Sequence, residues 1–377
     1  MRVDRSQSFA LSCLSAIPTS HSAPSAGAPR FKIERNMTIR PITADERERY
    51  RLSNEQRASF FRDGFLGPLP CYADRTLIDE LAEFLVRVER EKPIHPLYGR
   101  YSTRDWHLEN ERLRSLFVHP GMIVPLTQLM GEDLLLWRSK AFIKEPFGGE
   151  IGWHQEWGSF NGAEVGNDVP ALQPAGSLDD PWNVTIWFAL EDIDETMGPI
   201  RFVRGSHKRH FPVAQVPLPE AAFFEDPFNG LTDPMEIVRK AQDSTLILDI
   251  DTSHYFDGVE VTTLTFEQAR QVVLTHAARQ TGEVALPFEI APSDYITLPM
   301  AKGQFVIFYE RVMHGSGAST SSRTRAAVNC RVTPSTTLVY PQRLQGKYID
   351  GSNLNIKSHY CIPLCGTQRN PNNAYAP

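Results

Sequence analysis

The sequence predicts a mainly β fold with flanking helices: a two-sheet jelly-roll barrel, or double-stranded β-helix, with an inserted lid. Runs of β-branched and aromatic residues, separated by Gly, Pro and Asp, recur between residues 134 and 332 and indicate short strands. Within the aromatic stretch 152–157, His154 and Glu156 stand two residues apart. On a strand, that spacing places an imidazole and a carboxylate on the same face, where both can reach one ligand.

Length and composition favour a single domain. The chain has 377 residues, of which 41% are hydrophobic, enough to bury a large core. The net charge of −6 comes from interspersed signs, so we expect a small-molecule substrate and neither nucleic acid nor a membrane as partner. The odd, scattered set of cysteines favours a reducing, cytoplasmic location over a disulfide framework: Cys13, Cys71, Cys330, Cys361 and Cys365. The last two lack a second ligand pair nearby, which disfavours a zinc site.

Residues 1–45 are rich in Ser, Ala and Pro, and their one apolar run, at 9–17, is interrupted by serines and a cysteine. Such a run is too short and too polar to span a bilayer. We expect a disordered tail, or an upstream start codon with Met37 as the true beginning; a transit or targeting segment is the less favoured alternative. The folded domain is expected over residues 46–377.

The first part of this domain is predicted to be helical. Ser53 and Gln56 have the spacing of a capping box, and Gly64 offers a stop for a short helix. Asp74 can cap a longer helix, whose apolar residues recur at helical spacing: Leu77, Ile78, Leu81, Phe84, Leu85 and Val88. We expect this stripe to pack against one face of the barrel, and the apolar segment 121–130 to close the helical part.

Six strands are predicted after these helices. They lie at 134–144, near Trp153, and at 183–190, 200–203, 304–309 and 325–332. Turn residues punctuate them, and no internal repeat is apparent. This pattern suits two antiparallel sheets that close into a barrel.

A long insertion, about 208–299, interrupts the strands. It contains a helix opened by Asp233 and Pro234, and another from 265 to 280 with a Thr265/Gln268 capping box and Gly282 as its stop. Because an insertion of this length between barrel strands is typical of a lid, we expect substrate contacts there. Three polar residues of the insertion are interpreted as part of a loop and not as a second metal site: Asp249, Asp251 and His254.

His314 follows the strand 304–309. With His154 and Glu156 it would complete a 2-His-1-carboxylate facial triad, which holds Fe(II) and leaves positions open for oxygen and a co-substrate. Arg325 lies eleven residues beyond His314, at the start of the next strand, where it can clamp a dicarboxylate. Arg331 has the same strand parity as Arg325. It should face the same interior and meet a carboxylate, of the substrate, of Glu156 or of another acidic group.

These elements, in this order, resemble the phytanoyl-CoA dioxygenase family of Fe(II)/2-oxoglutarate oxygenases over roughly residues 53–341. The resemblance implies a cupin-like barrel that uses Fe(II), 2-oxoglutarate and O2. His154 and His314 match the iron-binding histidines of the family, and Glu156 stands where the family has aspartate. Arg325 matches the arginine that grips the distal carboxylate of 2-oxoglutarate.

The resemblance also suggests roles for residues around the triad. Gln155 fills the middle of an H-Q-D-like triplet and is expected at the cofactor site, and Ser316 matches a hydroxyl near Arg325. Trp187, one strand over, is expected either to form a wall of the co-substrate site and donate its indole N–H, or to be a plain core aromatic. His207 ends a Gly-Ser-His turn and is expected to be a turn residue and not a ligand.

The segments 136–142, 185–187 and 301–334 resemble more closely the non-haem iron halogenases that chlorinate carrier-tethered amino acids. Those enzymes carry Ala or Gly at the position of Glu156. A glutamate that reaches the metal would close the site to halide. One that turns to Arg331 or to solvent would leave a halogenase-like opening.

The sequence therefore predicts a hydroxylase of a small metabolite, amino-acid-like or a natural-product intermediate, free or carrier-tethered, that releases succinate and CO2. Two alternatives stay open. The same scaffold could support a halogenase or a desaturase, or the chain could be a catalytically silent cupin-type binding protein. A complete triad together with Arg325 argues against the silent protein, because a binding module needs neither iron ligands nor a dicarboxylate clamp.

Overall fold

The computed structural model describes the chain with interruptions, over residues 41–70, 73–156, 170–177, 180–212, 214–221, 224, 226–247, 250, 252–350 and 354–375. Most of the predicted tail 1–45 lies outside these residues. So do several positions singled out in the sequence: Cys13, Met37, Cys71, Trp157, Asp249 and Asp251.

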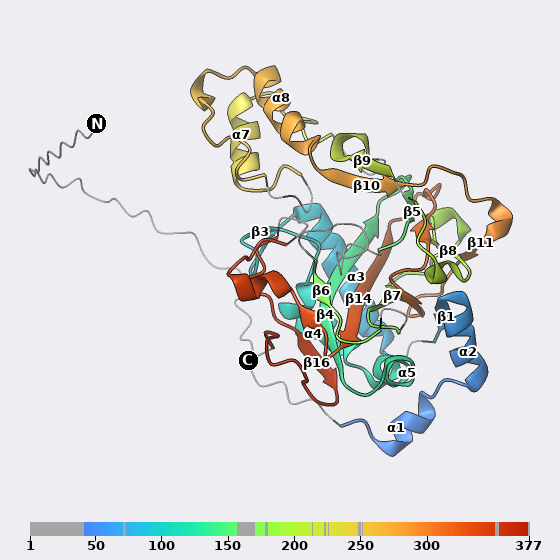
Figure 1. The fold of residues 1–377 in the computed structure, drawn as a ribbon. Helices are drawn as coiled ribbons and strands as arrows, with labels where there is room; N and C mark the ends of the chain where they lie inside the picture. Colours follow the sequence, from blue (N-terminus) through green and yellow to red (C-terminus); the bar gives the residue numbers. More distant parts are fainter. Residues whose placement is uncertain are drawn as a thin grey trace, which may run out of the picture. The chain divides into compact units, whose positions relative to one another are not determined.

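The larger sheet has six antiparallel strands in the order β1-β12-β7-β14-β4-β16 (Figure 1). Their bounds are Phe65–Leu69 (β1), Phe305–Tyr309 (β12), Val184–Ala189 (β7), Arg325–Pro334 (β14), Leu134–Lys144 (β4) and Ile362–Cys365 (β16). The four inner strands are those predicted from the sequence. The pattern misses both edge strands because each contains a proline, Pro68 or Pro363, which sheets tolerate at their edges.

The smaller sheet has four antiparallel strands in the order β11-β8-β13-β5. They are Tyr295–Leu298 (β11), Ile200–Val203 (β8), His314–Ser316 (β13) and Ile151–His154 (β5). Two sheets of this kind form the predicted jelly-roll barrel. One boundary needs correction: β11 falls inside the predicted insertion 208–299, but it pairs with β8 along its whole length, so the insertion ends before residue 295.

Alternation along the larger sheet divides its side chains between two apolar layers. Ile186 and Val328 point to the outer face and join the core beneath the helices. Trp187 and Ala327 point to the inner face, where they share a cluster with Phe202 of the smaller sheet. The site described below is built on this inner face.

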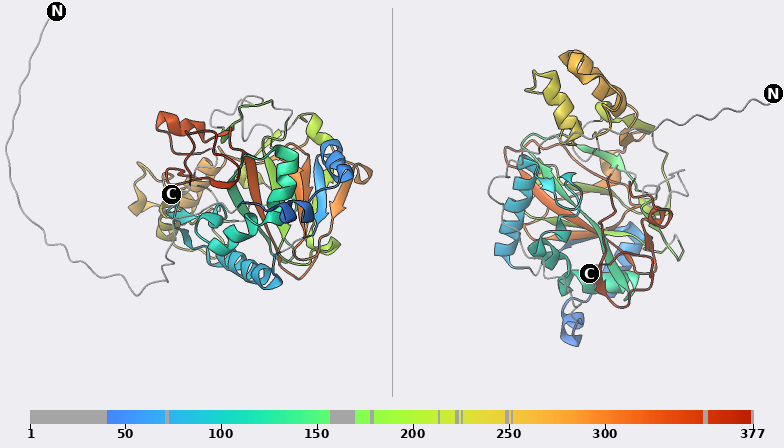
Figure 2. Two further views of the ribbon diagram at one scale, coloured as in Figure 1. Left: turned by 90° about the horizontal axis from the view of Figure 1, so that it is seen from below. Right: turned by 90° about the vertical axis from the view of Figure 1, so that its left-hand side faces the viewer.

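Five α-helices in the described residues precede β4, with β1 between the second and the third: Ala44–Arg49 (α1), Asn54–Asp63 (α2), Arg75–Glu91 (α3), Glu111–Phe117 (α4) and Pro120–Met130 (α5). Figure 2 shows α3, α4 and α5 against the larger sheet. The predicted caps are confirmed. Ser53 and Gln56 form a capping box, Gly64 ends α2 in the left-handed conformation, and Asp74 caps α3.

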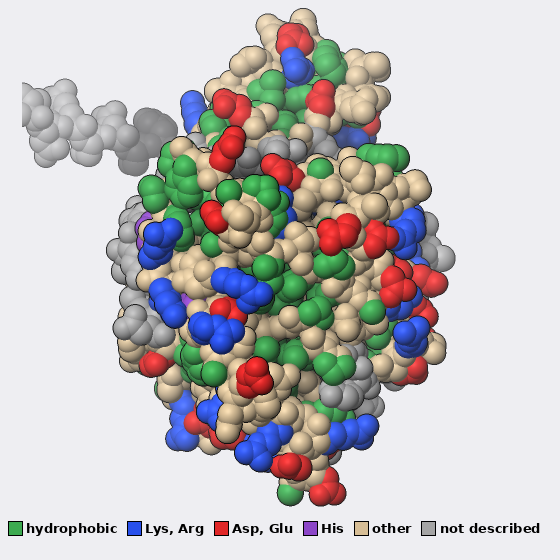
Figure 3. Space-filling view, turned by 90° about the vertical axis from the view of Figure 1, so that its right-hand side faces the viewer, with side chains coloured by type: hydrophobic (Ala, Val, Ile, Leu, Met, Phe, Trp, Pro, Cys, Tyr) green, Lys and Arg blue, Asp and Glu red, His purple; other side chains and the backbone are tan. Residues whose placement is uncertain are grey.

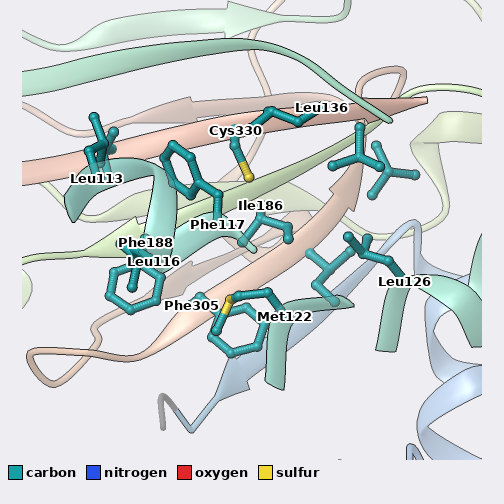
Figure 4. Close-up of a cluster of buried hydrophobic side chains, with 14 of the residues drawn as sticks. Leu113, Leu116, Phe117, Met122, Leu126, Leu136, Ile186, Phe188, Phe305 and Cys330 are labelled. Carbon is teal, nitrogen blue, oxygen red and sulfur yellow. The ribbon is translucent and has the colours of Figure 1, made fainter. Parts of the chain in front are cut away.

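The outer core joins these helices to the sheet. Figure 4 shows Leu116 and Phe117 of α4, and Met122 of α5, beside Ile186 and Phe188 of β7. The apolar stripe predicted on α3 contributes to the same cluster, with four of its six residues buried and two partly buried. Such burial, at about 25 cal/mol per Å² of apolar surface, is the main stabilising contribution of these helices.

The insertion contains Ala214–Pro217 (β9), Pro234–Gln242 (α7), Phe266–Ala277 (α8) and Thr281–Ala285 (β10). Asp233 caps α7 and the Thr265/Gln268 box opens α8, as predicted. Gly282 is not the stop of α8, because the helix ends at Ala277 and Gly282 lies in β10, which pairs with β9. The helix pair, which stands apart from the two sheets in Figure 1, has an apolar cluster of its own, including Ile237, Val238, Tyr255, Phe256, Ala269 and Val273.

Four two-residue strands complete the fold: Ile94–His95 (β2), Arg100–Tyr101 (β3), Leu172–Gln173 (β6) and Leu338–Val339 (β15). On the face shown in Figure 3, acidic and basic side chains are interspersed, in keeping with the mixed charge of the sequence. Among the described residues, no helix has the length and apolarity needed to span a bilayer.

Shortening Leu85 tests the packing of α3. Leu85 is 1% exposed within the outer core, so Leu85→Ala should lower the free energy of unfolding by about 2–5 kcal/mol, measured by urea denaturation. Glu83→Ala, on the exposed face of the same helix, should change it by less than about 0.5 kcal/mol. Equal stability of the two variants would contradict the packing of α3 described here.

Candidate active site

Two histidines from distant parts of the chain lie opposite each other in the smaller sheet. His154, at the end of β5, is the register partner of His314, at the start of β13, and their ring centroids are 4.2 Å apart. The pairing requires Gly315, because a Cβ there would lie 2.8 Å from the carbonyl oxygen of Ile151. The His-Gly sequence thus lets β13 approach β5 closely enough to set two imidazoles side by side.

Each imidazole is oriented by a backbone carbonyl two residues before it. Nδ1 of His154 lies 2.8 Å from the carbonyl oxygen of Gly152, and Nδ1 of His314 lies 2.9 Å from that of Val312. A carbonyl oxygen only accepts, so each Nδ1 carries the hydrogen and each Nε2 keeps its lone pair. Burial, reinforced by His154, lowers the pKa of His314 to about 3. His314 is therefore neutral near pH 7, the form in which imidazole binds metals.

Glu156 lies beyond the strand, which corrects one expectation. β5 ends at His154, so Glu156 does not share a strand face with it. The N–H of Glu156 donates to the carbonyl of Glu310 at 3.0 Å, and Oε1 accepts from Nη2 of Arg331 at 2.7 Å. Burial alone would raise the pKa of Glu156, but Arg331 and the two imidazoles outweigh it and lower the pKa. The expected meeting of Arg331 with a carboxylate is confirmed.

The donor set suits Fe(II) in kind, since two imidazoles and one carboxylate are the ligands of a facial triad. The two Nε2 atoms are free of the backbone, and Oε2 of Glu156 has no hydrogen-bond partner among the described residues. In the present rotamers, however, Glu156 is directed to Arg331. Within the described ranges, no group of three His, Cys, Asp or Glu side chains is arranged around one metal position.

A second buried carboxyl lies near this pair, and sequence reasoning missed it. Glu310 is fully buried, and within the described part of the chain neither of its carboxyl oxygens has a hydrogen-bond partner. Nε of Arg311 is 3.6 Å from Oε1. Burial raises the pKa of Glu310 to about 8, so the group is mostly neutral at pH 7 and adds little negative charge beside Glu156. Its strand parity with Phe308 was the one available signal of its inward position.

Arg325 is buried at the start of β14, with 2% of its surface exposed. Its Nη1 donates to the carbonyl of Gly198 at 2.5 Å, and its Cζ lies 5.5 Å from the ring centroid of Trp187. Its Nε has no partner among the described residues, and none of their carboxylates pairs with it. Burial lowers its pKa to about 10, so it is still charged at pH 7. A buried, unbalanced guanidinium calls for an anionic ligand.

Two further side chains lie at the same end of the barrel. Trp187 belongs to the inner apolar layer and also lies against Arg325, so it is at once a core aromatic and a neighbour of the expected co-substrate group. Ser316 is buried on β13, where its Oγ accepts a hydrogen bond from Nζ of Lys144 at 3.1 Å. Sequence reasoning missed Lys144, because only the register between β4 and β14 places it opposite Arg325.

The sequence as a whole decides the family. The family model described as phytanoyl-CoA dioxygenase (PhyH) matches residues 60–327, more than two thirds of the chain. The chain belongs to the phytanoyl-CoA dioxygenase family. It is therefore an Fe(II)- and 2-oxoglutarate-dependent oxygenase, with Fe(II), 2-oxoglutarate and O2 as its cofactor and co-substrates.

Solved structures with the same fold share little sequence with this family member. The structure described as CytC3 with Fe(II) and alpha-ketoglutarate has a TM-score of 0.55 and 17% identity, over 87% of this chain and 93% of that one. The apo structure of the non-heme monooxygenase ThoJ has a TM-score of 0.51 and 15% identity, over 85% of this chain and 86% of that one. These likenesses confirm the jelly-roll fold. No curated protein sequence matches the chain.

In this member of the family, the side-chain amide of Gln155 joins separate backbone segments by hydrogen bonds. Its Nε2 lies 3.1, 3.0 and 2.8 Å from the carbonyl oxygens of Ser206, Arg209 and Arg311 and shares its two hydrogens among them. Its Oε1 accepts from the N–H of Phe211 at 2.9 Å. The amide is thus used by the backbone, which differs from the cofactor-binding role expected for Gln155. It fixes the chain between His154 and Glu156 against the start of the insertion.

Two other histidines have separate roles. His207 lies in a turn after β8 and stacks on Tyr309, with ring centroids 4.8 Å apart, as expected for a turn residue. Burial lowers its pKa to about 4. His254 packs edge-on against Tyr255 in the insertion, and the described residues around it form no metal-binding group.

Removing the Gln155 amide tests whether its hydrogen bonds to the backbone stabilise the fold. Gln155→Ala removes the amide that donates to these carbonyls and accepts from the N–H of Phe211, so the free energy of unfolding should fall by about 1–3 kcal/mol in urea denaturation. Gln271→Ala, on the exposed face of α8, should change it by less than about 0.5 kcal/mol. A Gln155→Ala protein with unchanged stability would mean that solvent replaces these hydrogen bonds without loss.

Proposed function

We propose that this oxygenase hydroxylates a C–H bond of a small metabolite, with release of succinate and CO2. In this proposal His154, His314 and Glu156 hold Fe(II), which supplies the activation of O2 when bound. The observation that carries the proposal is the pair of buried imidazoles, each with its Nδ1 held by the backbone and its Nε2 available. A catalytically silent barrel has no need of such a pair.

Arg325 and Ser316 take the distal carboxylate of 2-oxoglutarate in this scheme. The buried guanidinium lacks a carboxylate partner among the described residues, and a bound dicarboxylate would provide one by a charge-assisted hydrogen bond. Trp187 lies against the same guanidinium and shields it from water. The keto-acid end of the co-substrate then extends toward the two histidines.

Substrates of the amino-acid or natural-product type, free or carrier-tethered, are our preferred class. The resemblance of several segments to halogenases of carrier-tethered amino acids supports this choice. A screen of such compounds for substrate-stimulated succinate release, with Fe(II) and 2-oxoglutarate supplied, tests the function as a whole. If no succinate forms at saturating Fe(II), either with the screened compounds or in the uncoupled reaction without them, the chain would be better explained as a silent binding protein.

Halogenation is a second candidate, and one contact favours it. Oε1 of Glu156 is paired with Arg331 at 2.7 Å, which is the arrangement expected if the glutamate leaves a coordination position open for chloride. Oε2 of the same carboxylate has no partner among the described residues, so one oxygen can stay on Arg331 while the other reaches the metal. We prefer this second arrangement, because it satisfies both the arginine and the metal with one carboxylate.

Arg325→Ala should weaken 2-oxoglutarate binding while sparing the metal. Losing one partner of a buried charge pair costs about 2–5 kcal/mol, so the dissociation constant should rise more than tenfold, measured by calorimetry on Ni(II)-loaded protein. Arg323→Ala is a matched control, since that arginine is exposed and pairs with Asp194. Unchanged 2-oxoglutarate binding in Arg325→Ala would mean that another residue binds the distal carboxylate, and Arg331 would be the next candidate.

Glu156 decides between the two chemistries. Turnover in excess chloride should yield hydroxylated product by mass spectrometry. Glu156→Ala should lower the affinity for Co(II) at least about tenfold and abolish or sharply lower hydroxylation, because a metal ligand is lost. Chlorinated product as the main species from the unmodified protein, with metal affinity unaffected by Glu156→Ala, would make halogenation the better assignment.

A further inference from the structure

Two buried basic side chains lie opposite each other on neighbouring strands of the larger sheet. Lys144, the last residue of β4, is the register partner of Arg325, the first residue of β14. Lys144 is 6% exposed and Arg325 is 2% exposed. Directly paired residues of an antiparallel sheet point to the same face, so both side chains belong to the inner face of the barrel.

The ammonium group of Lys144 has a full set of acceptors. Its Nζ donates to the carbonyls of Gly149 and Gly317 at 2.7 and 2.5 Å, and to Oγ of Ser316 at 3.1 Å. In its protonated form Lys144 has no lone pair, so Ser316 then accepts in this hydrogen bond. The hydroxyl hydrogen of Ser316 is therefore directed away from Lys144 and is available to a further acceptor.

The charge at this place is unbalanced. Burial, together with Arg325 and Arg201, lowers the pKa of Lys144 to about 7. Glu150 opposes this shift only weakly, because its carboxylate is half exposed and pairs with Arg201 at 3.3 Å. Among the described residues, no carboxylate forms an ion pair with either Lys144 or Arg325. Full charge on two neighbouring buried basic groups is unfavourable without an anion, so a negatively charged ligand, which favours the protonated form of Lys144, suits the site.

We propose that Lys144 is a positioning residue for the distal carboxylate of 2-oxoglutarate, which it aids through Ser316. The ammonium group fixes the Ser316 hydroxyl as a donor toward the carboxylate, and its charge adds to that of Arg325. The inference rests on the proposed function, since it places the co-substrate beside Arg325. Lys144 could instead have a purely structural role and only connect residues 144–149 to β13. Its removal would then change the affinity for ligands with and without that carboxylate by the same factor.

The test compares two keto acids on the Ni(II)-loaded full chain by calorimetry. 2-Oxoglutarate carries the distal carboxylate, and 2-oxopentanoate has a methyl group in its place. Lys144→Met should raise the dissociation constant of 2-oxoglutarate at least about tenfold and leave that of 2-oxopentanoate within about twofold. Lys347→Met, at an exposed lysine, should change neither.

A second variant supports the test if Lys144→Met folds poorly. Ser316→Ala keeps the lysine and should show the same selective loss of 2-oxoglutarate affinity. Because the two residues act in series, the double variant should lose less than the product of the two single losses.

Three outcomes would overturn the proposal. Unchanged 2-oxoglutarate affinity in Lys144→Met, or an equal loss for both keto acids, would leave Lys144 a structural residue while the proposed function stands. Failure of the unmodified, Ni(II)-loaded protein to bind either keto acid would instead refute the co-substrate site itself.

Discussion

The register between β5 and β13 is the constraint on which the site depends. It sets His154 opposite His314, residues 160 positions apart in the sequence, and a slip of one residue would turn one imidazole to the other face of the sheet. Gly315 makes the approach sterically possible, and the bulge between His314 and Ser316 shifts the pairing immediately after it. The carbonyls that hold each Nδ1 then leave the two Nε2 atoms for a shared ligand.

Strand β14 distributes charge along the inner face. Arg325 lies at its start beside Lys144, and Arg331 lies six residues later beside Glu156, with the small Ala327 between them in an apolar cluster. At the start of β14, Arg325 and Lys144 have no carboxylate partner in the described part of the chain. Near its other end, Arg331 is paired with Glu156. This separation suits a co-substrate with a charge at one end and a metal-binding group at the other.

Local chemistry explains which features the sequence could predict. The caps at Ser53, Asp74, Asp233 and Thr265 depend on residues within one turn, and the structure has each of them. The inner strands follow from runs of aliphatic and aromatic residues between turn signals. The position of Lys144 opposite Arg325 depends instead on the pairing of distant strands, which one sequence does not show. The same holds for Glu156, whose N–H bonds to the carbonyl of the distant Glu310 just after β5 ends at His154.

The insertion is connected to the histidine pair more directly than its separate core suggests. Its helices bury a cluster of their own, separate from the two clusters of the barrel. Its first residues, however, are held by Gln155, whose Oε1 accepts from the N–H of Phe211 while its Nε2 binds the chain before β13. Because Gln155 stands between His154 and Glu156, a displacement at the start of the insertion acts on the segment that carries both groups. If Glu156 holds the metal as proposed, a ligand that displaces the start of the insertion would influence how its carboxylate is shared between Arg331 and the metal.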